Sequence, residues 1–81
     1  MNIVFYGGGN IAQAFIEGLI NSGYKKNNIF YIDRNPKNKD KLKKLKIKSL
    51  NNKQSLKIDL FVLSVKPKDA IHAYKDILIN Y

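Results

Sequence analysis

Three consecutive glycines, Gly7 to Gly9, separate a strand-like run from a helix-like run. The run before them, Ile3 to Tyr6, consists of β-branched and aromatic residues, which suits a strand buried on both faces of a parallel sheet. From Asn10 to about Asn21 the apolar residues recur every four positions, as an amphipathic helix requires. A glycine turn between a buried strand and a helix therefore favours a fold with parallel strands and crossover helices.

The rest of the sequence continues this alternation. Asn35 followed by Pro36 predicts a helix start, because the amide can cap free backbone donors and proline has no donor to leave unpaired. Further strands are predicted at residues 29–32, 47–50 and 60–65, and further helices from residue 36 and from residue 67 to the end. The prediction is an α/β fold, part of a Rossmann-like parallel sheet with about four strands in the order 3-2-1-4 and helices on both faces.

Two more glycines bear on the first helix. Gly23 follows its last apolar residue and predicts its end. Gly18 lies inside it, where glycine costs about 1 kcal/mol relative to alanine. Close packing of this helix against the sheet would be one compensation.

Composition excludes several classes of protein. With 44% hydrophobic and 26% charged residues, the 81-residue chain has the composition of one globular domain. It contains no cysteine and one histidine, so neither a disulfide framework nor a metal site is expected. It also lacks a run of about 18 apolar residues and a secretory signal, so we expect a cytoplasmic protein with no membrane partner.

The net charge of +9 is concentrated in one segment. Nine lysines and a single acid lie between Lys37 and Lys57, and this segment carries +8 of the total. A small nucleic-acid-binding module could use such a patch, with steeply salt-dependent binding to DNA. Lysines along the outer face of a helix are more often simply solvated, so no nucleic-acid partner is expected.

The glycine run matches the pattern that binds the pyrophosphate of a dinucleotide. In Gly7-Gly8-Gly9-Asn10-Ile11-Ala12 the first glycine allows a tight turn, Gly9 leaves room for the pyrophosphate, and Ala12 lets the helix lie close to the strand. Gly8 is interpreted as adding adaptability. The helix N-terminus supplies free N–H groups and a partial positive charge for the anion. A structural turn is the alternative, whereas a nucleoside triphosphatase loop is excluded because no Gly-Lys-Ser or Gly-Lys-Thr follows.

The end of the second predicted strand carries candidate groups for the cofactor's ribose. Asp33 lies where an acid would contact the ribose 2′-hydroxyl of NAD, and Arg34 lies where a guanidinium would contact the 2′-phosphate of NADP. Asn35 could add a hydrogen bond to that phosphate, although capping of the next helix is its favoured role. An exposed ion pair is the alternative for Asp33 and Arg34. The residues favour NADP and leave NAD open.

The chain resembles the N-terminal part of Δ1-pyrroline-5-carboxylate reductase along its whole length. The resemblance is carried by the run from Phe5 to Ala12, by Ala14 and Gly18, and most sharply by Leu63-Ser64-Val65-Lys66-Pro67. It implies that Ser64, Val65, Lys66 and Pro67 line the nicotinamide half of the cofactor. It also implies that Asn51 contacts the adenosine side, and that Tyr6 belongs to the cofactor site beside the glycines.

The resemblance further implies a longer protein. Residues 1–81 would be the first part of an NAD(P)-binding Rossmann domain, and an absent C-terminal domain would supply the dimer interface and the substrate pocket. The complete enzyme would be a homo-oligomer that transfers hydride to the C=N bond of 1-pyrroline-5-carboxylate and gives L-proline, and the chain alone would be inactive. No catalytic residue is predicted, because His72 lacks an orienting partner in the sequence pattern.

Several other proteins share such a loop. A deazaflavin-dependent NADP reductase, a prephenate or 3-hydroxyisobutyrate type dehydrogenase and a nucleotide-sensing regulatory domain would all show it. Val65-Lys66-Pro67 favours the proline enzyme over these alternatives.

Overall fold

The structure is a computed structural model that describes residues 1–50 and 57–80. Four strands, β1 (Ile3–Tyr6), β2 (Ile29–Ile32), β3 (Lys48–Ser49) and β4 (Leu60–Leu63), form one sheet in the order β3-β2-β1-β4. All three strand pairings are parallel. The predicted α/β fold, its parallel sheet and its strand order are confirmed.

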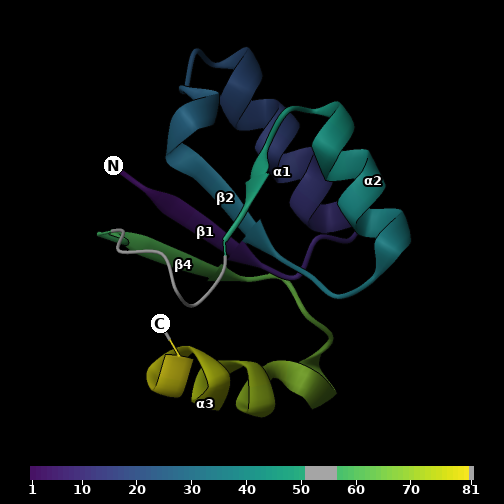
Figure 1. Ribbon diagram of the computed structural model, residues 1–81, viewed down its shortest axis with the longest axis vertical. Coiled ribbons are helices and arrows are strands. Elements are labelled where there is room, and N and C mark those ends of the chain that lie inside the picture. Colours follow the sequence, from purple (N-terminus) through teal and green to yellow (C-terminus); the bar gives the residue numbers. More distant parts are fainter. Residues whose placement is uncertain (51–56, 81) are drawn as a thin grey trace.

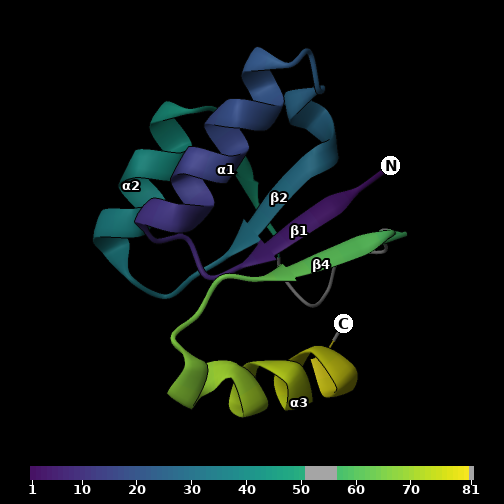
Figure 2. The same cartoon turned by 180° about the vertical axis from the view of Figure 1, so that it is seen from behind.

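The helices lie on both faces of the sheet, as predicted. Helices α1 (Asn10–Asn21) and α2 (Pro36–Lys44) cover one face, and α3 (Ala70–Asn80) lies across the other (Figures 1 and 2). Short 3-10 turns, η1 (Lys26–Asn28) and η2 (Pro67–Asp69), precede β2 and α3. Pro67 therefore begins a tight turn and the α-helix starts three residues later.

The two faces of the sheet are packed unequally. On the face covered by α1 and α2, the core contains the fully buried side chains of Phe5, Ile16, Ile29 and Leu42. On the opposite face the buried cluster of the described residues is smaller, with Val4, Phe30 and Leu50 against half-buried neighbours from β2, β4 and the residues just before β4. Burial of apolar area contributes about 25 cal/mol per Å², so the α1 and α2 face supplies most of the hydrophobic stabilisation.

The ends of the first two helices follow the sequence signals. Gly23 has φ +93°, a left-handed conformation that suits glycine, and its N–H donates to the carbonyl of Ile20. The side chain of Asn35 accepts a hydrogen bond of 2.9 Å from the N–H of Lys37. Asn35 is therefore the cap of α2, as its favoured role predicts.

Two expectations about elements are corrected. The predicted strand 60–65 ends at Leu63, because the chain leaves the sheet after Ser64 N–H donates to the carbonyl of Tyr6. Gly18 does not pack closely against the sheet: it is exposed, and a Cβ built there would meet no atom within 4 Å.

Apolar side chains remain exposed along β4 and α3. Leu60 and Leu63, on the edge strand β4, are 45% and 42% exposed, and Leu78 of α3 is 66% exposed. Ile71 and Tyr74 of α3 are also exposed. Ile71, Tyr74 and Leu78 have helical spacing, so they form an apolar stripe along α3. The described residues do not cover this stripe.

We expect Gly18→Ala to stabilise the fold by about 0.5–1 kcal/mol, since alanine is the better helix former and the site offers open space. Gly23→Ala is the matched control: it also has open space, but its positive φ strains any side chain, so a loss of about 1 kcal/mol is expected. Urea unfolding followed by circular dichroism measures both changes. A destabilising Gly18→Ala would show that this helix needs glycine for a reason other than space.

Candidate cofactor site

The register of the sheet places three loop residues side by side. Tyr6 pairs with Ile32 of β2 and with Leu63 of β4, so these three strands end at the same level. The next residues along the chain are Gly7, Asp33 and Ser64. Hydrogen bonds of 2.8 Å, from Gly7 N–H to the carbonyl of Ile32 and from Ser64 N–H to the carbonyl of Tyr6, continue the pairing one step further.

Gly7 makes the turn that a side chain would block. Its φ is +100°, and a Cβ built there would lie 2.6 Å from the carbonyl oxygen of Ser64. Because the obstacle is backbone, it cannot move aside as a flexible side chain could. The predicted role of the first glycine, a tight turn, is the role it has in the structure.

Gly9 lies at the N-terminus of α1 and faces open space. A Cβ built on Gly9 would meet nothing within 4 Å, and no side chain caps the helix there. The first N–H groups of an α-helix have no partner within the helix. The loop therefore presents backbone donors and the positive end of a helix dipole without an obstructing side chain, which is the arrangement that anions bind.

Gly8 is held by Leu42, Asp33 and Gln13, so its interpretation as an adaptable residue is wrong. It is buried, and a Cβ would lie 2.6 Å from Cδ1 of the fully buried Leu42. Its N–H donates to Oδ2 of Asp33 at 2.6 Å. Its carbonyl accepts a hydrogen bond of 2.8 Å from Nε2 of Gln13.

Asp33 is directed at the glycine loop. Besides the Gly8 N–H, its carboxylate accepts hydrogen bonds from Asn38 Nδ2 at 2.9 Å and from the Asn35 N–H at 2.7 Å. A carboxylate satisfied by three N–H donors is fixed in place. The neighbouring Arg34 side chain is exposed.

A cleft of about 1510 Å³ joins the glycine loop, the end of β4 and α3. Pockets for drug-sized ligands are smaller, roughly 300–1,000 Å³, so the cleft suits an extended ligand. Among the sequence-predicted site residues it is lined by residues 6–12, Asp33, Arg34 and residues 64–67. Asn35 does not line it, because its side chain caps α2, and Asn51 lies outside the described residues.

Sequence reasoning missed several residues that line the cleft. Asn38 lies in α2, and only the register of that helix, which places its side chain beside Asp33, could have identified it. Asp76 and Asn80 could have been identified only from the position of α3. Phe15 lines the cleft from α1 and its ring lies 5.5 Å from that of Phe5.

A hydrogen bond joins α3 to the sheet across the cleft. The hydroxyl of Tyr6 donates a hydrogen bond to Oδ2 of Asp76, and Nδ2 of Asn80 donates to the other oxygen of that carboxylate. The bond from Tyr6 is the largest cause that lowers the pKa of Asp76, and the positive charge of Arg34 lowers it further. His72 of α3 also lines the cleft, with its side chain exposed.

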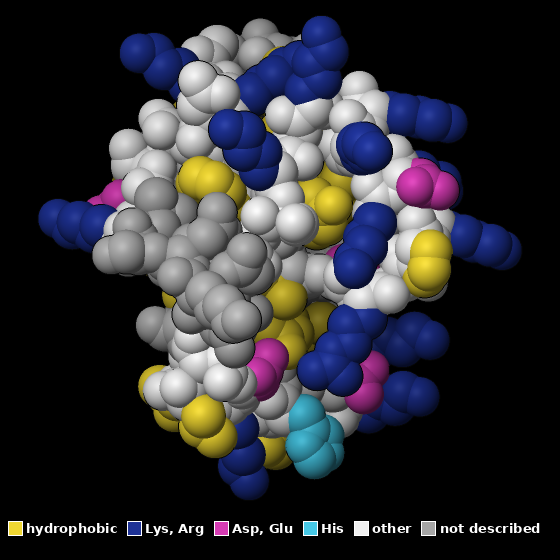
Figure 3. All heavy atoms as spheres, viewed as in Figure 1, with side chains coloured by type: hydrophobic (Ala, Val, Ile, Leu, Met, Phe, Trp, Pro, Cys, Tyr) yellow, Lys and Arg dark blue, Asp and Glu magenta, His cyan; other side chains and the backbone are white. Residues whose placement is uncertain are grey.

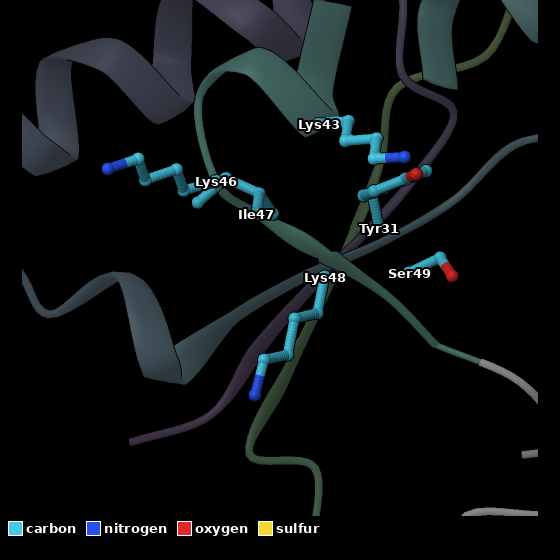
Figure 4. A pocket seen from close by; sticks show the side chains of 6 residues that line it. All are labelled: Tyr31, Lys43, Lys46, Ile47, Lys48 and Ser49. Carbon is cyan, nitrogen blue, oxygen red and sulfur yellow. The ribbon is translucent and has the colours of Figure 1, made fainter. Parts of the chain in front are cut away.

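None of the described lysines between Lys37 and Lys57 lines this cleft. In Figure 3 the lysine and arginine side chains gather on the side where α2 lies, and hydrophobic side chains lie within a hollow between the sheet and α3. A shallow hollow beside β3 is lined by Tyr31, Ile47, Ser49 and three lysines. Figure 4 shows the Lys46 and Lys48 side chains pointing away from each other, so the lysines do not converge on one point. Burial raises the pKa of Tyr31.

Residues 1–50 and 57–80 can be compared with what a metal site and a membrane-spanning helix require. These residues contain no group of three or more His, Cys, Asp or Glu that could hold a metal ion. No helix in the same residues has both the length and the apolar character needed to cross a bilayer.

A family model described as NADP oxidoreductase, coenzyme F420-dependent, matches residues 2–80. The chain belongs to this NADP oxidoreductase family. The matched residues include β1, the glycine loop and α1, which form the proposed pyrophosphate site. They also include the described residues that line the cleft. No curated protein matches the chain.

We expect Tyr6→Phe to lower the thermal unfolding midpoint at neutral pH, and this difference to vanish in acid. The pKa of Asp76 is lowered in the folded state, so its bond to Tyr6 contributes stability above the ordinary aspartate pKa of about 3.9. That contribution is lost as the pH falls through the lowered pKa, because the carboxyl group then takes up a proton.

Circular dichroism melts of both proteins at pH 7 and near pH 2 test this expectation. Tyr74→Phe removes an exposed hydroxyl from α3 and should have no effect at either pH. A Tyr6→Phe difference of equal size at both pH values would contradict the role of the carboxylate.

Proposed function

We propose that this chain is the cofactor-binding part of an NADP-dependent reductase, with the dinucleotide extended along the cleft. The observation that carries the proposal is the glycine loop, where open space at Gly9 meets an uncapped helix N-terminus. A pyrophosphate placed there would accept hydrogen bonds from backbone N–H groups and interact with the helix dipole. These features fit the group, since a Cβ at Gly9 would occupy the space that the anion needs.

Arg34 would bind the 2′-phosphate of the adenosine ribose. It lines the cleft, it is exposed, and it is the second residue after β2, whose end lies beside the glycine loop. A guanidinium offers paired N–H donors that match phosphate oxygens. Three donors already bind the Asp33 carboxylate, which leaves it little acceptor capacity for the 2′-hydroxyl of NAD.

Residues 64–67 would lie beside the nicotinamide. They follow β4, next to Gly7, on the side of the loop away from Asp33. The resemblance of Leu63-Ser64-Val65-Lys66-Pro67 to pyrroline-5-carboxylate reductase supports this placement. The bound cofactor supplies a hydride, and the protein's contribution is to position it.

We further propose that the substrate is 1-pyrroline-5-carboxylate, whose C=N bond accepts the hydride to give L-proline. A second candidate is a deazaflavin-dependent NADP reductase, which the description of the matching family favours. In either case the substrate pocket and a homo-oligomeric interface would come from residues outside this chain. Loss of NADPH absorbance with pyrroline-5-carboxylate or with oxidised coenzyme F420 as the acceptor, assayed in the proposed complete enzyme, separates the two candidates.

The 81-residue chain itself should bind NADPH without turning over either substrate. Titration followed by NADPH fluorescence, with NADH and duplex DNA as further ligands, tests the class of function. Salt-dependent binding of DNA together with indifference to both nucleotides would overturn the proposal in favour of a nucleic-acid module using the Lys37–Lys57 segment.

We expect Arg34→Ala to weaken NADPH binding by about 10- to 100-fold, since hydrogen bonds to charged groups contribute about 1.5–3 kcal/mol. NADH binding should be nearly unchanged, because NADH lacks the 2′-phosphate. Lys26→Ala removes the same charge from an exposed residue of η1, remote from the cleft, and should leave both affinities unchanged. An equal loss for both nucleotides in Arg34→Ala would show that Arg34 does not select the phosphate.

A further inference from the structure

We propose that Asp33 and Gln13 are positioning residues for the glycine loop. Asp33 holds the N–H of Gly8 and Gln13 holds its carbonyl, and together they keep the loop in the conformation that binds the pyrophosphate. This inference rests on the proposed dinucleotide site and assigns Asp33 a role other than contact with the ribose. Asp33 accepts the Gly8 N–H at 2.6 Å, and Gln13 donates to the Gly8 carbonyl at 2.8 Å.

Gln13 acts on the loop from outside the cleft. Its side chain is half-buried on α1 and does not line the cleft, whereas Gly8 and Gly9 do. A trans peptide is planar, with its C=O and the following N–H pointing in opposite directions. Because the Gly8 carbonyl points at Gln13, the Gly9 N–H of the same peptide points away from Gln13.

Asp33 fixes the preceding peptide in the same way. The N–H of the Gly7–Gly8 peptide donates a hydrogen bond to Asp33, which holds this peptide beside the end of β2. Asn38 Nδ2 and the Asn35 N–H bind the same carboxylate and hold it in place from α2 and its cap. Glycine has the greatest backbone freedom of any residue, so a loop of three glycines gains much from such restraint.

The positioning role predicts a pattern of NADPH and NADH affinities that differs from the pattern expected if Asp33 bound the ribose. The pyrophosphate is common to NADPH and NADH, so loss of either positioning residue should weaken both equally. If Asp33 instead bound the ribose, Asp33→Ala would weaken NADH alone and would leave NADPH unchanged or bound more tightly.

The experiment measures dissociation constants of the 81-residue chain for NADPH and NADH by cofactor fluorescence, and for adenosine 2′-monophosphate by competition. Asp33→Ala and Gln13→Met are compared with Glu17→Met, an exposed change one turn further along α1. We expect both variants to lose about tenfold in affinity for each dinucleotide, equivalent to roughly 1.4 kcal/mol. Binding of adenosine 2′-monophosphate, which has no pyrophosphate, should not change, and Glu17→Met should match the wild type.

The outcomes separate the two proposals. A wild-type chain that binds neither dinucleotide would overturn the proposed function and this inference with it. Wild-type binding combined with a selective effect of Asp33→Ala, or with no effect of Gln13→Met, would overturn the positioning role alone. Equal weakening of all three ligands would also overturn it, because that result indicates general destabilisation. Should Asp33→Ala fail to fold, Gln13→Met decides, since that side chain is half-exposed and outside the two cores.

Discussion

The parallel pairing of β1 with both of its neighbours is the constraint on which the site depends. Because β2 and β4 are in the same register on β1, their carboxyl ends coincide. Gly7, Asp33 and Ser64 are far apart in the sequence and become neighbours only through that register. Parallel α/β sheets bind ligands outside the carboxyl ends of their strands, and the cleft lies at this edge.

Charge contributes to the site locally. The side chains that line the cleft include three cations, Arg34, Lys66 and Lys68, and three acids, Asp33, Asp69 and Asp76. The excess of positive charge lies mainly in the Lys37–Lys57 segment, and none of the described lysines of that segment lines the cleft. An anion in the cleft would therefore depend on backbone N–H groups, on the helix dipole and on Arg34, and little on the net charge of +9.

Much of the fold could be predicted from the sequence because its signals are local. Apolar runs, helical spacing, the Asn35-Pro36 cap and the glycine pattern each act within a few residues, and together they predicted the elements and their order. The role of Gly8 could not be predicted, since it depends on Leu42 and Asp33 packing against it from another helix and strand. The direction of the Asp33 carboxylate, toward the loop, is likewise a tertiary property.

The position of α3 could not be predicted from the sequence either. Its apolar spacing indicated a helix correctly, but spacing alone does not state whether the apolar stripe is covered. In the structure Ile71, Tyr74 and Leu78 are exposed, and Ala73 is the buried residue of this helix. The contact between Tyr6 and Asp76 joins residues 70 positions apart, and no motif marks it.

The unequal packing of the two faces divides the site into halves of different rigidity. The glycine loop rests on the larger core, where Gly8 contacts Leu42 and α1 is anchored by Ile16. Residues 64–67 instead lead into α3, which leaves much of its apolar surface exposed. Local opening is easiest where few apolar contacts are buried. The end of the cleft beside the glycine loop is consequently the preformed end, and the end beside α3 can adjust at lower cost in free energy.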